Sequence, residues 1–70
     1  MKEIKSEMTG VIDQVLVEEG SNVEVGQKVI VVESMKSLIT IESSVAGAVQ
    51  QVLIAPGDFV EEGQVLLVLE

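Results

Sequence analysis

The chain has 70 residues, which suffices for one small domain, and 47% of them are hydrophobic, mainly valine, isoleucine and leucine. It contains no cysteine and no histidine, which excludes disulfides, thiolate nucleophiles, imidazole bases and the usual zinc ligands. Its net charge of -8, from twelve carboxylates and four lysines, disfavours binding to nucleic acids and anionic membranes. We therefore expect no metal site, no catalytic residue and no free-standing enzyme.

The apolar runs are too short to cross a bilayer, the longest being residues 29–32 and 65–69. The N-terminus lacks the apolar stretch of a secretory signal. We therefore expect a soluble protein in the cytoplasm.

The sequence repeats itself with an offset of 37 residues, so that residues 10–33 align with residues 47–70 without a gap. Eleven of the 24 aligned pairs are identical, and six of the other 13 exchange one aliphatic residue for another. Alternating apolar residues between glycine-containing turns predict strands in both halves. In chain order, we expect strands around residues 4–8, 11–17, 23–25, 28–33, 38–42, 48–54, 60–61 and 65–69.

The bridge between the halves, residues 34–46, contains a chain reversal. Strand-like residues run from 28 to 42, and one straight strand of that length would extend about 50 Å. A compact chain of 70 residues is only about 30 Å across, so the run must fold back. Its polar interruption at residues 34–37 predicts a hairpin with Met35 and Lys36 at the tip. A two-residue turn prefers Asn-Gly or Asp-Gly, and Met35-Lys36 departs from this preference. Such a departure marks a candidate functional position.

These elements predict an all-β domain that spans residues 1–70. We expect a flattened barrel-sandwich of two antiparallel sheets, each of about four strands, with internal pseudo-two-fold symmetry. Because the hairpin joins the two halves, its tip should lie at one end of the domain and both termini near the other. Lys36 would then point away from whatever the domain is attached to.

The segment Glu33-Ser34-Met35-Lys36, followed by alternating apolar residues and Ala46-Gly47, resembles the attachment hairpin of the biotinyl/lipoyl domain family. The turns at residues 19–27 and 56–64 resemble that family's paired Gly-Asp-x-Val-x-x-Gly-Gln turns. The resemblance covers essentially the whole chain and is greatest to biotin carboxyl carrier domains. Ser37 departs from the family pattern, since a second methionine commonly follows the lysine. Residues 6–10 also depart from the common Ala-Pro-Met-x-Gly.

The resemblance implies that Lys36 is the attachment residue, and Met35 before it favours biotin, because lipoyl domains typically carry aspartate there. It further implies a biotin protein ligase, which would recognise Glu33, Ser34, Met35 and Ser37 around the hairpin and join biotin to Lys36 through a biotinyl-adenylate. The domain would then swing carboxybiotin between biotin carboxylase and carboxyltransferase sites.

Two other functions stay open. In the first, Lys36 carries lipoate in a 2-oxo acid dehydrogenase-type complex. In the second, the domain is an unmodified structural module of the same fold. Met35 could also simply cover the root of the hairpin, and Glu33 could belong to the scaffold, because Glu70 occupies the equivalent position of the repeat. The paired carboxylates at 18–19 and 61–62 flank turn glycines and are interpreted as solvated loops.

Overall fold

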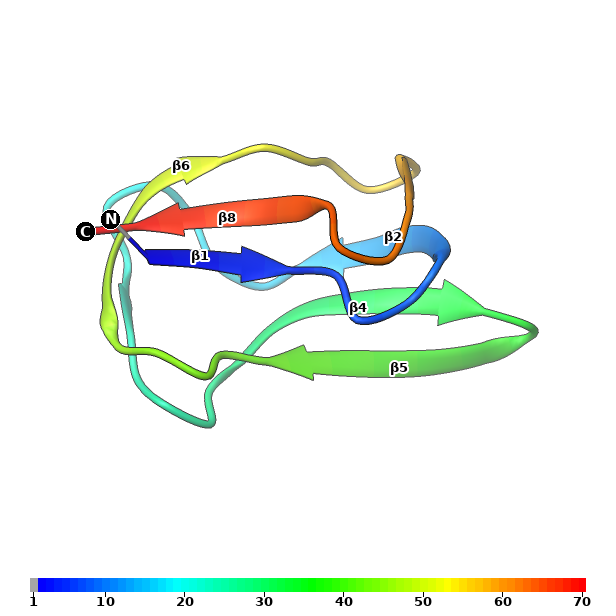
Figure 1. The fold of residues 1–70 in the computed structure, drawn as a ribbon, viewed down its shortest axis with the longest axis horizontal. Coiled ribbons are helices and arrows are strands. Elements are labelled where there is room, and N and C mark those ends of the chain that lie inside the picture. The colour runs from blue at the N-terminus through cyan, green and yellow to red at the C-terminus, as the bar shows by residue number, and fades with distance from the viewer. Residues whose placement is uncertain (1) are drawn as a thin grey trace.

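The computed structural model describes residues 2–70, which form eight β-strands and no helix (Figure 1). Every paired strand runs antiparallel to its neighbour. One four-stranded sheet has the order β1-β8-β6-β3 and the other has the order β5-β4-β2-β7. The predicted two-sheet architecture is therefore confirmed. The strands are β1 (Lys2–Lys5), β2 (Gly10–Val15), β3 (Asn22–Val23), β4 (Lys28–Ser34), β5 (Ser37–Glu42), β6 (Gly47–Val52), β7 (Phe59–Val60) and β8 (Val65–Leu69).

Branched aliphatic side chains fill the space between the sheets, mostly from alternate residues of the strands, although β4 and β8 each bury two consecutive residues. β4 and β8 contribute most of the side chains that are completely buried. The single phenylalanine, Phe59, lies outside this core and is 61% exposed. The buried hydrophobic residues are Ile4, Ile12, Val17, Val23, Val29, Ile30, Val32, Ile41, Val49, Ile54, Val60, Leu66, Leu67 and Leu69.

The two halves of the chain have matching strand registers. Ile12 pairs with Val32 as Val49 pairs with Leu69, each partner being displaced by 37 residues. The match also includes β1 and β5, since the pairing of Ile4 with Leu67 corresponds to that of Ile41 with Ile30. The structural symmetry therefore extends beyond residues 10–33 and 47–70, where the sequence repeat is evident.

The first strand lies earlier in the chain than predicted. We expected it around residues 4–8, whereas β1 ends at Lys5. Ser6 is buried, and its hydroxyl donates a hydrogen bond to the carbonyl oxygen of Met8, which turns the chain out of the sheet. Ser43, its counterpart in the second half, donates in the same way to Val45. The prediction for residues 6–8 was therefore wrong because these residues form a turn closed by a serine side chain.

The β4–β5 hairpin and the chain termini lie at opposite ends of the molecule (Figure 1). The hairpin is paired from Lys28 and Glu42 to Ser34 and Ser37, and at the other end Lys2 pairs with Leu69. The molecule measures 32 × 19 × 18 Å, too short for a straight strand over residues 28–42. The predicted reversal is confirmed. Residues 2–70 contain no helix that is long and apolar enough to cross a membrane.

Candidate functional site

The hairpin tip is a two-residue turn in which both central residues are left-handed. Ser34 pairs with Ser37, and between them Met35 has φ 50° and Lys36 has φ 66°. Positive φ at both positions is the geometry of a type I′ turn, whose twist suits the flanking strands. Among residues 2–70, these two are the only non-glycine residues with positive φ. Each costs about 1 kcal/mol relative to glycine, so the sequence keeps a side chain here at the expense of stability.

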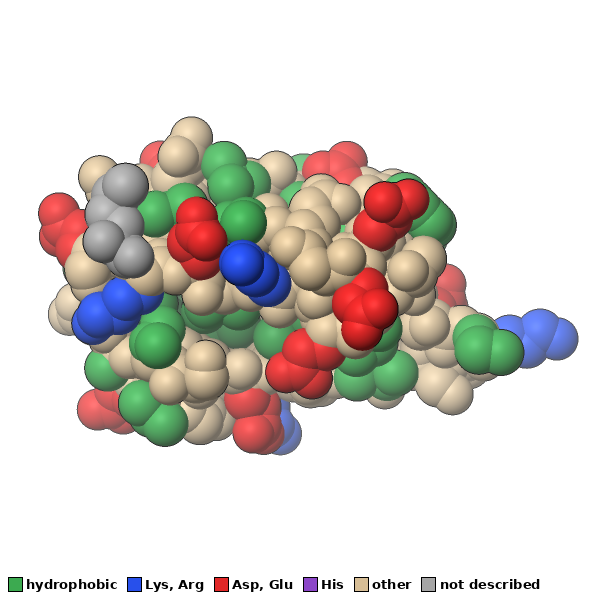
Figure 2. Space-filling model, viewed as in Figure 1, with side chains coloured by type: hydrophobic (Ala, Val, Ile, Leu, Met, Phe, Trp, Pro, Cys, Tyr) green, Lys and Arg blue, Asp and Glu red, His purple; other side chains and the backbone are tan. Residues whose placement is uncertain are grey.

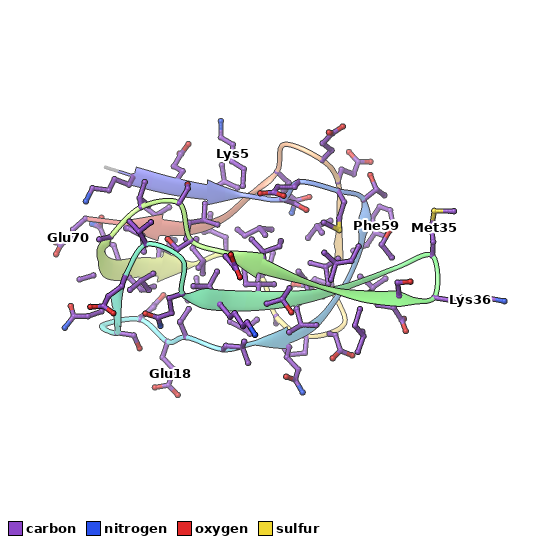
Figure 3. The ribbon with its side chains drawn as sticks, turned by 90° about the horizontal axis from the view of Figure 1, so that it is seen from below. Lys5, Glu18, Met35, Lys36, Phe59 and Glu70 are labelled. Carbon is purple, nitrogen blue, oxygen red and sulfur yellow. The ribbon has the colours of Figure 1, made fainter. Side chains whose placement is uncertain are left out.

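The turn projects from the body of the domain. Figure 2 shows a narrow extension that ends in a basic side chain, and Figure 3 identifies this residue as Lys36. Lys36 is exposed and Met35 is 94% exposed. Met35 therefore does not cover the root of the hairpin, which rules out that interpretation of the residue. The turn presents a thioether and a primary amine with space for a large group on the amine.

Ser34 and Ser37 have different surroundings although they face each other across the hairpin. The hydroxyl of Ser34, which is half-buried, donates a hydrogen bond of 3.0 Å to the carbonyl oxygen of Thr9. This bond ties the root of the hairpin to the loop ahead of β2. Ser37 is exposed. Thr9 could not be predicted as the partner of Ser34, because 25 residues separate the two.

Glu33 lies one residue below the turn, on the outer face of its sheet. It is exposed and pairs with Leu38 on one side and with Val11 on the other. Its repeat counterpart Glu70 is also exposed, and its backbone N–H donates to the carbonyl oxygen of Ala48. The position is thus compatible both with a recognition residue and with a residue of the scaffold.

Gly10 allows β2 to approach β4 closely at the root of the hairpin. A Cβ atom on Gly10 would lie 2.5 Å from the carbonyl oxygen of Glu33 and 2.8 Å from a methyl carbon of Val32. Gly47 has the equivalent relation to the carbonyl oxygen of Glu70, at 2.5 Å. Both glycines are identical in the repeat, and this recurrence is the signal in the sequence of their shared packing role.

The paired carboxylates lie in exposed turns. The residues at 18–19 and 61–62 are all exposed. The hydroxyl of Ser21 accepts a hydrogen bond of 3.2 Å from the backbone N–H of Glu18, and the side chain of Gln64 accepts one of 3.2 Å from that of Glu61. These bonds close the turns, as the interpretation of solvated loops implies. No cluster of three or more potential metal ligands occurs among residues 2–70, and their surface has no pocket. The chemistry that this end of the domain offers is the presentation of an amine.

Comparison with known proteins agrees with this geometry. Residues 2–69 match the biotin/lipoyl family model described as biotin-requiring enzyme. The fold is similar to part of a single-chain, multi-domain long-chain acyl-CoA carboxylase, with a TM-score of 0.87 and 27% identity over 94% of this chain. It is also similar to part of the urea carboxylase of Kluyveromyces lactis, with a TM-score of 0.90 and 32% identity over 99% of this chain.

The chain spans only 7% and 6% of the length of those two carboxylases. Among curated proteins, none matches its sequence. The family match nevertheless covers all but the two terminal residues, and the fold similarity to the urea carboxylase covers 99% of this chain. The chain therefore belongs to the biotin/lipoyl attachment family, and it is a non-catalytic carrier domain like those of biotin-dependent carboxylases.

Proposed function

We propose that the domain carries biotin as an amide on the ε-amine of Lys36. The observation that carries this proposal is the exposed type I′ turn, in which Met35 and Lys36 keep side chains at positions that favour glycine. Met35 supports biotin over lipoate, because lipoyl domains typically carry aspartate before the lysine. The projecting tip also suits a bulky group, since Lys36 lies beyond the body of the domain (Figure 3).

The attachment step requires an activated acyl group, because the carboxylate of free biotin has no leaving group that an amine can displace. In the proposed reaction the unprotonated amine of Lys36 attacks the carbonyl carbon of biotinyl-adenylate. A carbon–nitrogen bond forms, the bond from that carbon to the phosphate oxygen breaks, AMP leaves, and the amine proton passes to the ligase or to solvent. The hairpin contributes position, since the turn holds the amine clear of both sheets.

Bound biotin supplies a ureido ring that accepts and releases a carboxyl group, while the protein supplies its placement. The Lys36 side chain and the attached biotin would form a flexible extension beyond the paired strands β4 and β5. This extension would let the carboxyl group reach sites at different positions. We further propose that its partners are a biotin carboxylase site and a carboxyltransferase site of a larger assembly. Tethering makes each visit effectively intramolecular and avoids free diffusion of a labile intermediate.

Co-expression with a biotin protein ligase, followed by intact-mass measurement, tests the proposal. We expect the wild-type domain to gain the mass of one biotinyl group and the Lys36→Arg variant to gain none. A parallel co-expression with a lipoate ligase tests the competing cofactor. The proposal is wrong if the biotin ligase leaves the wild type unmodified, or if the lipoate ligase modifies it instead.

A further inference from the structure

An apolar row lies on the outer face of the β5-β4-β2-β7 sheet, next to the hairpin. Leu38 pairs with Glu33, Glu33 pairs with Val11, and Val11 pairs with Phe59, so the four residues cross the sheet on one face. We call them the hairpin-side row. Leu38 and Phe59 are each 61% exposed, and Val11 is 38% exposed. In Figure 3, Phe59 lies at the same end of the molecule as Met35 and Lys36.

The internal symmetry shows which residues of the row the fold requires, because each strand position has a counterpart 37 residues away. In the repeat, the counterpart of Val11 is Ala48 and that of Phe59 is Asn22. Ala48 and Asn22 pair with each other near the termini. Glu33 becomes Glu70, so the charge is the same at both ends. The same strand positions thus fold without large apolar groups, and the scaffold does not require Val11 or Phe59 on the surface.

Not every exposed apolar residue differs between the halves in this way. Val25 and Ile39 also do, since their repeat counterparts are Glu62 and Lys2. Leu16 and Leu53 are equivalent in the repeat and are 48% and 44% exposed, so both halves carry leucine at that position. Isolated exposed aliphatic residues are common on soluble proteins. The hairpin-side row is distinct because Val11 and Phe59 are direct cross-strand neighbours, include the only aromatic residue of the chain, and are replaced by Ala48 and Asn22 in the other half.

We propose that the hairpin-side row is the surface by which a biotin protein ligase recognises the unmodified domain, an inference that rests on the proposed function. Aromatic and aliphatic groups that become desolvated on docking supply most of the energy of typical protein interfaces. The row is adjacent to Lys36, as a surface must be if its partner acts on that amine. The net charge of -8 favours a ligase whose contact surface is apolar at its centre and basic at its rim.

The ligase has a greater need of such a surface than the carboxylase sites have. The similar solved structures contain a domain of this fold within much longer chains, in which the matched part makes up 7% and 6% of the length. A domain tethered in this way meets its carboxylase sites at a high effective concentration, so weak contacts suffice. A ligase is a separate molecule that meets the domain by diffusion, and its selectivity depends on the affinity of the contact itself.

The symmetry supplies the test variants. Val11→Ala combined with Phe59→Asn gives the row the residues that the other half already carries at those positions. The reciprocal control, Ala48→Val combined with Asn22→Phe, adds the same side chains at the end near the termini. Initial rates of biotinylation are measured with a biotin protein ligase at saturating biotin and ATP while the concentration of the unmodified domain is varied. Circular dichroism and thermal unfolding verify that each variant is folded.

We expect the row variant to raise KM about tenfold with kcat within about twofold of wild type, and the reciprocal control to leave both unchanged. As a second measurement, Lys36→Arg protein, which keeps the row, should inhibit the wild-type reaction competitively. The same protein with the row variant should inhibit about tenfold more weakly. This competition does not depend on the acylation step.

An unchanged KM and an unchanged inhibition constant for the row variant would overturn the inference while the proposed function stood, because the wild type would still be biotinylated. An equal rise in KM for the reciprocal control would also overturn it, since recognition would then not depend on the hairpin end. Failure of the wild type to accept biotin at all would overturn both proposals together.

Discussion

The hydroxyl of Ser34 donates a hydrogen bond of 3.0 Å to the carbonyl oxygen of Thr9, and this bond connects the hairpin root to the loop that precedes β2. The turn beyond it is exposed on all sides, so its orientation depends on the strands beneath it and on this one side-chain contact. Ser34 therefore restrains the direction in which Lys36 points without touching the amine.

Replacement of Ser34 by alanine should loosen the hairpin root. The loss of this exposed hydrogen bond should cost about 0.5–1.5 kcal/mol, and amide hydrogen exchange in residues 34–38 should become faster. Ser37→Ala is the matched control on the facing, exposed position, and we expect it to change exchange little. Equal acceleration in both variants would show that the bond to Thr9 does not restrain the hairpin.

Gly10→Ala should destabilise the fold more than Gly20→Ala does. A Cβ atom at Gly10 would lie 2.5 Å from a backbone oxygen of β4, whereas at Gly20, with φ +92°, nothing lies within 4 Å. Alanine at Gly20 incurs only backbone strain of about 1 kcal/mol, while at Gly10 the strands must separate, for about 2–4 kcal/mol. Chemical denaturation measures both costs, and the reverse order would contradict the packing role of Gly10.

Met35→Asn should make the domain more stable and a poorer substrate for the ligase. Asparagine adopts positive φ more readily than methionine does, so we expect a gain of about 0.5–1 kcal/mol in the free energy of unfolding. We expect biotinylation to slow, because the thioether next to Lys36 is lost. Ser44→Asn, at an exposed loop position, controls for the substitution itself. An unchanged stability would mean that the left-handed turn stores no strain.

Leu66→Ala should remove much of the stability of the domain. Leu66 is completely buried between the sheets, and such truncations cost about 2–5 kcal/mol. Leu53→Ala, at a position that is 44% exposed, should cost less than about 1 kcal/mol. Thermal or chemical denaturation of both variants measures the two losses of stability. Similar losses would contradict the assignment of Leu66 to the core and Leu53 to the surface.

Much of the architecture could be predicted from two features of the sequence, the internal repeat and the short length of the chain. The repeat implied the symmetric halves, and the length of the strand-like run over residues 28–42 required the hairpin that places Met35 and Lys36 at its tip. The role of residues 2–9 as a second copy of 39–46 was missed. Ile4 and Ser6 are the only residues identical to their counterparts there, so the pairing pattern, not the sequence, shows the relation.

The contacts of the site were less predictable than its position. The bond from Ser34 to Thr9 joins residues 25 apart, and the alignment of Leu38, Val11 and Phe59 depends on the register of four strands. No local pattern contains that information. The attachment of biotin to Lys36 stays a prediction, because it requires a ligase in addition to the fold. The same holds for the recognition roles of Glu33, Ser34, Met35 and Ser37.

Site-resolved mass spectrometry of the domain after reaction with a biotin protein ligase tests the central claim most directly. The chain offers four lysines, at positions 2, 5, 28 and 36, and only Lys36 lies in the projecting turn. We predict one biotinyl group, on Lys36, with the other three lysines unmodified. Modification at Lys2, Lys5 or Lys28 in place of Lys36, or continued biotinylation of the Lys36→Arg variant, would contradict the account.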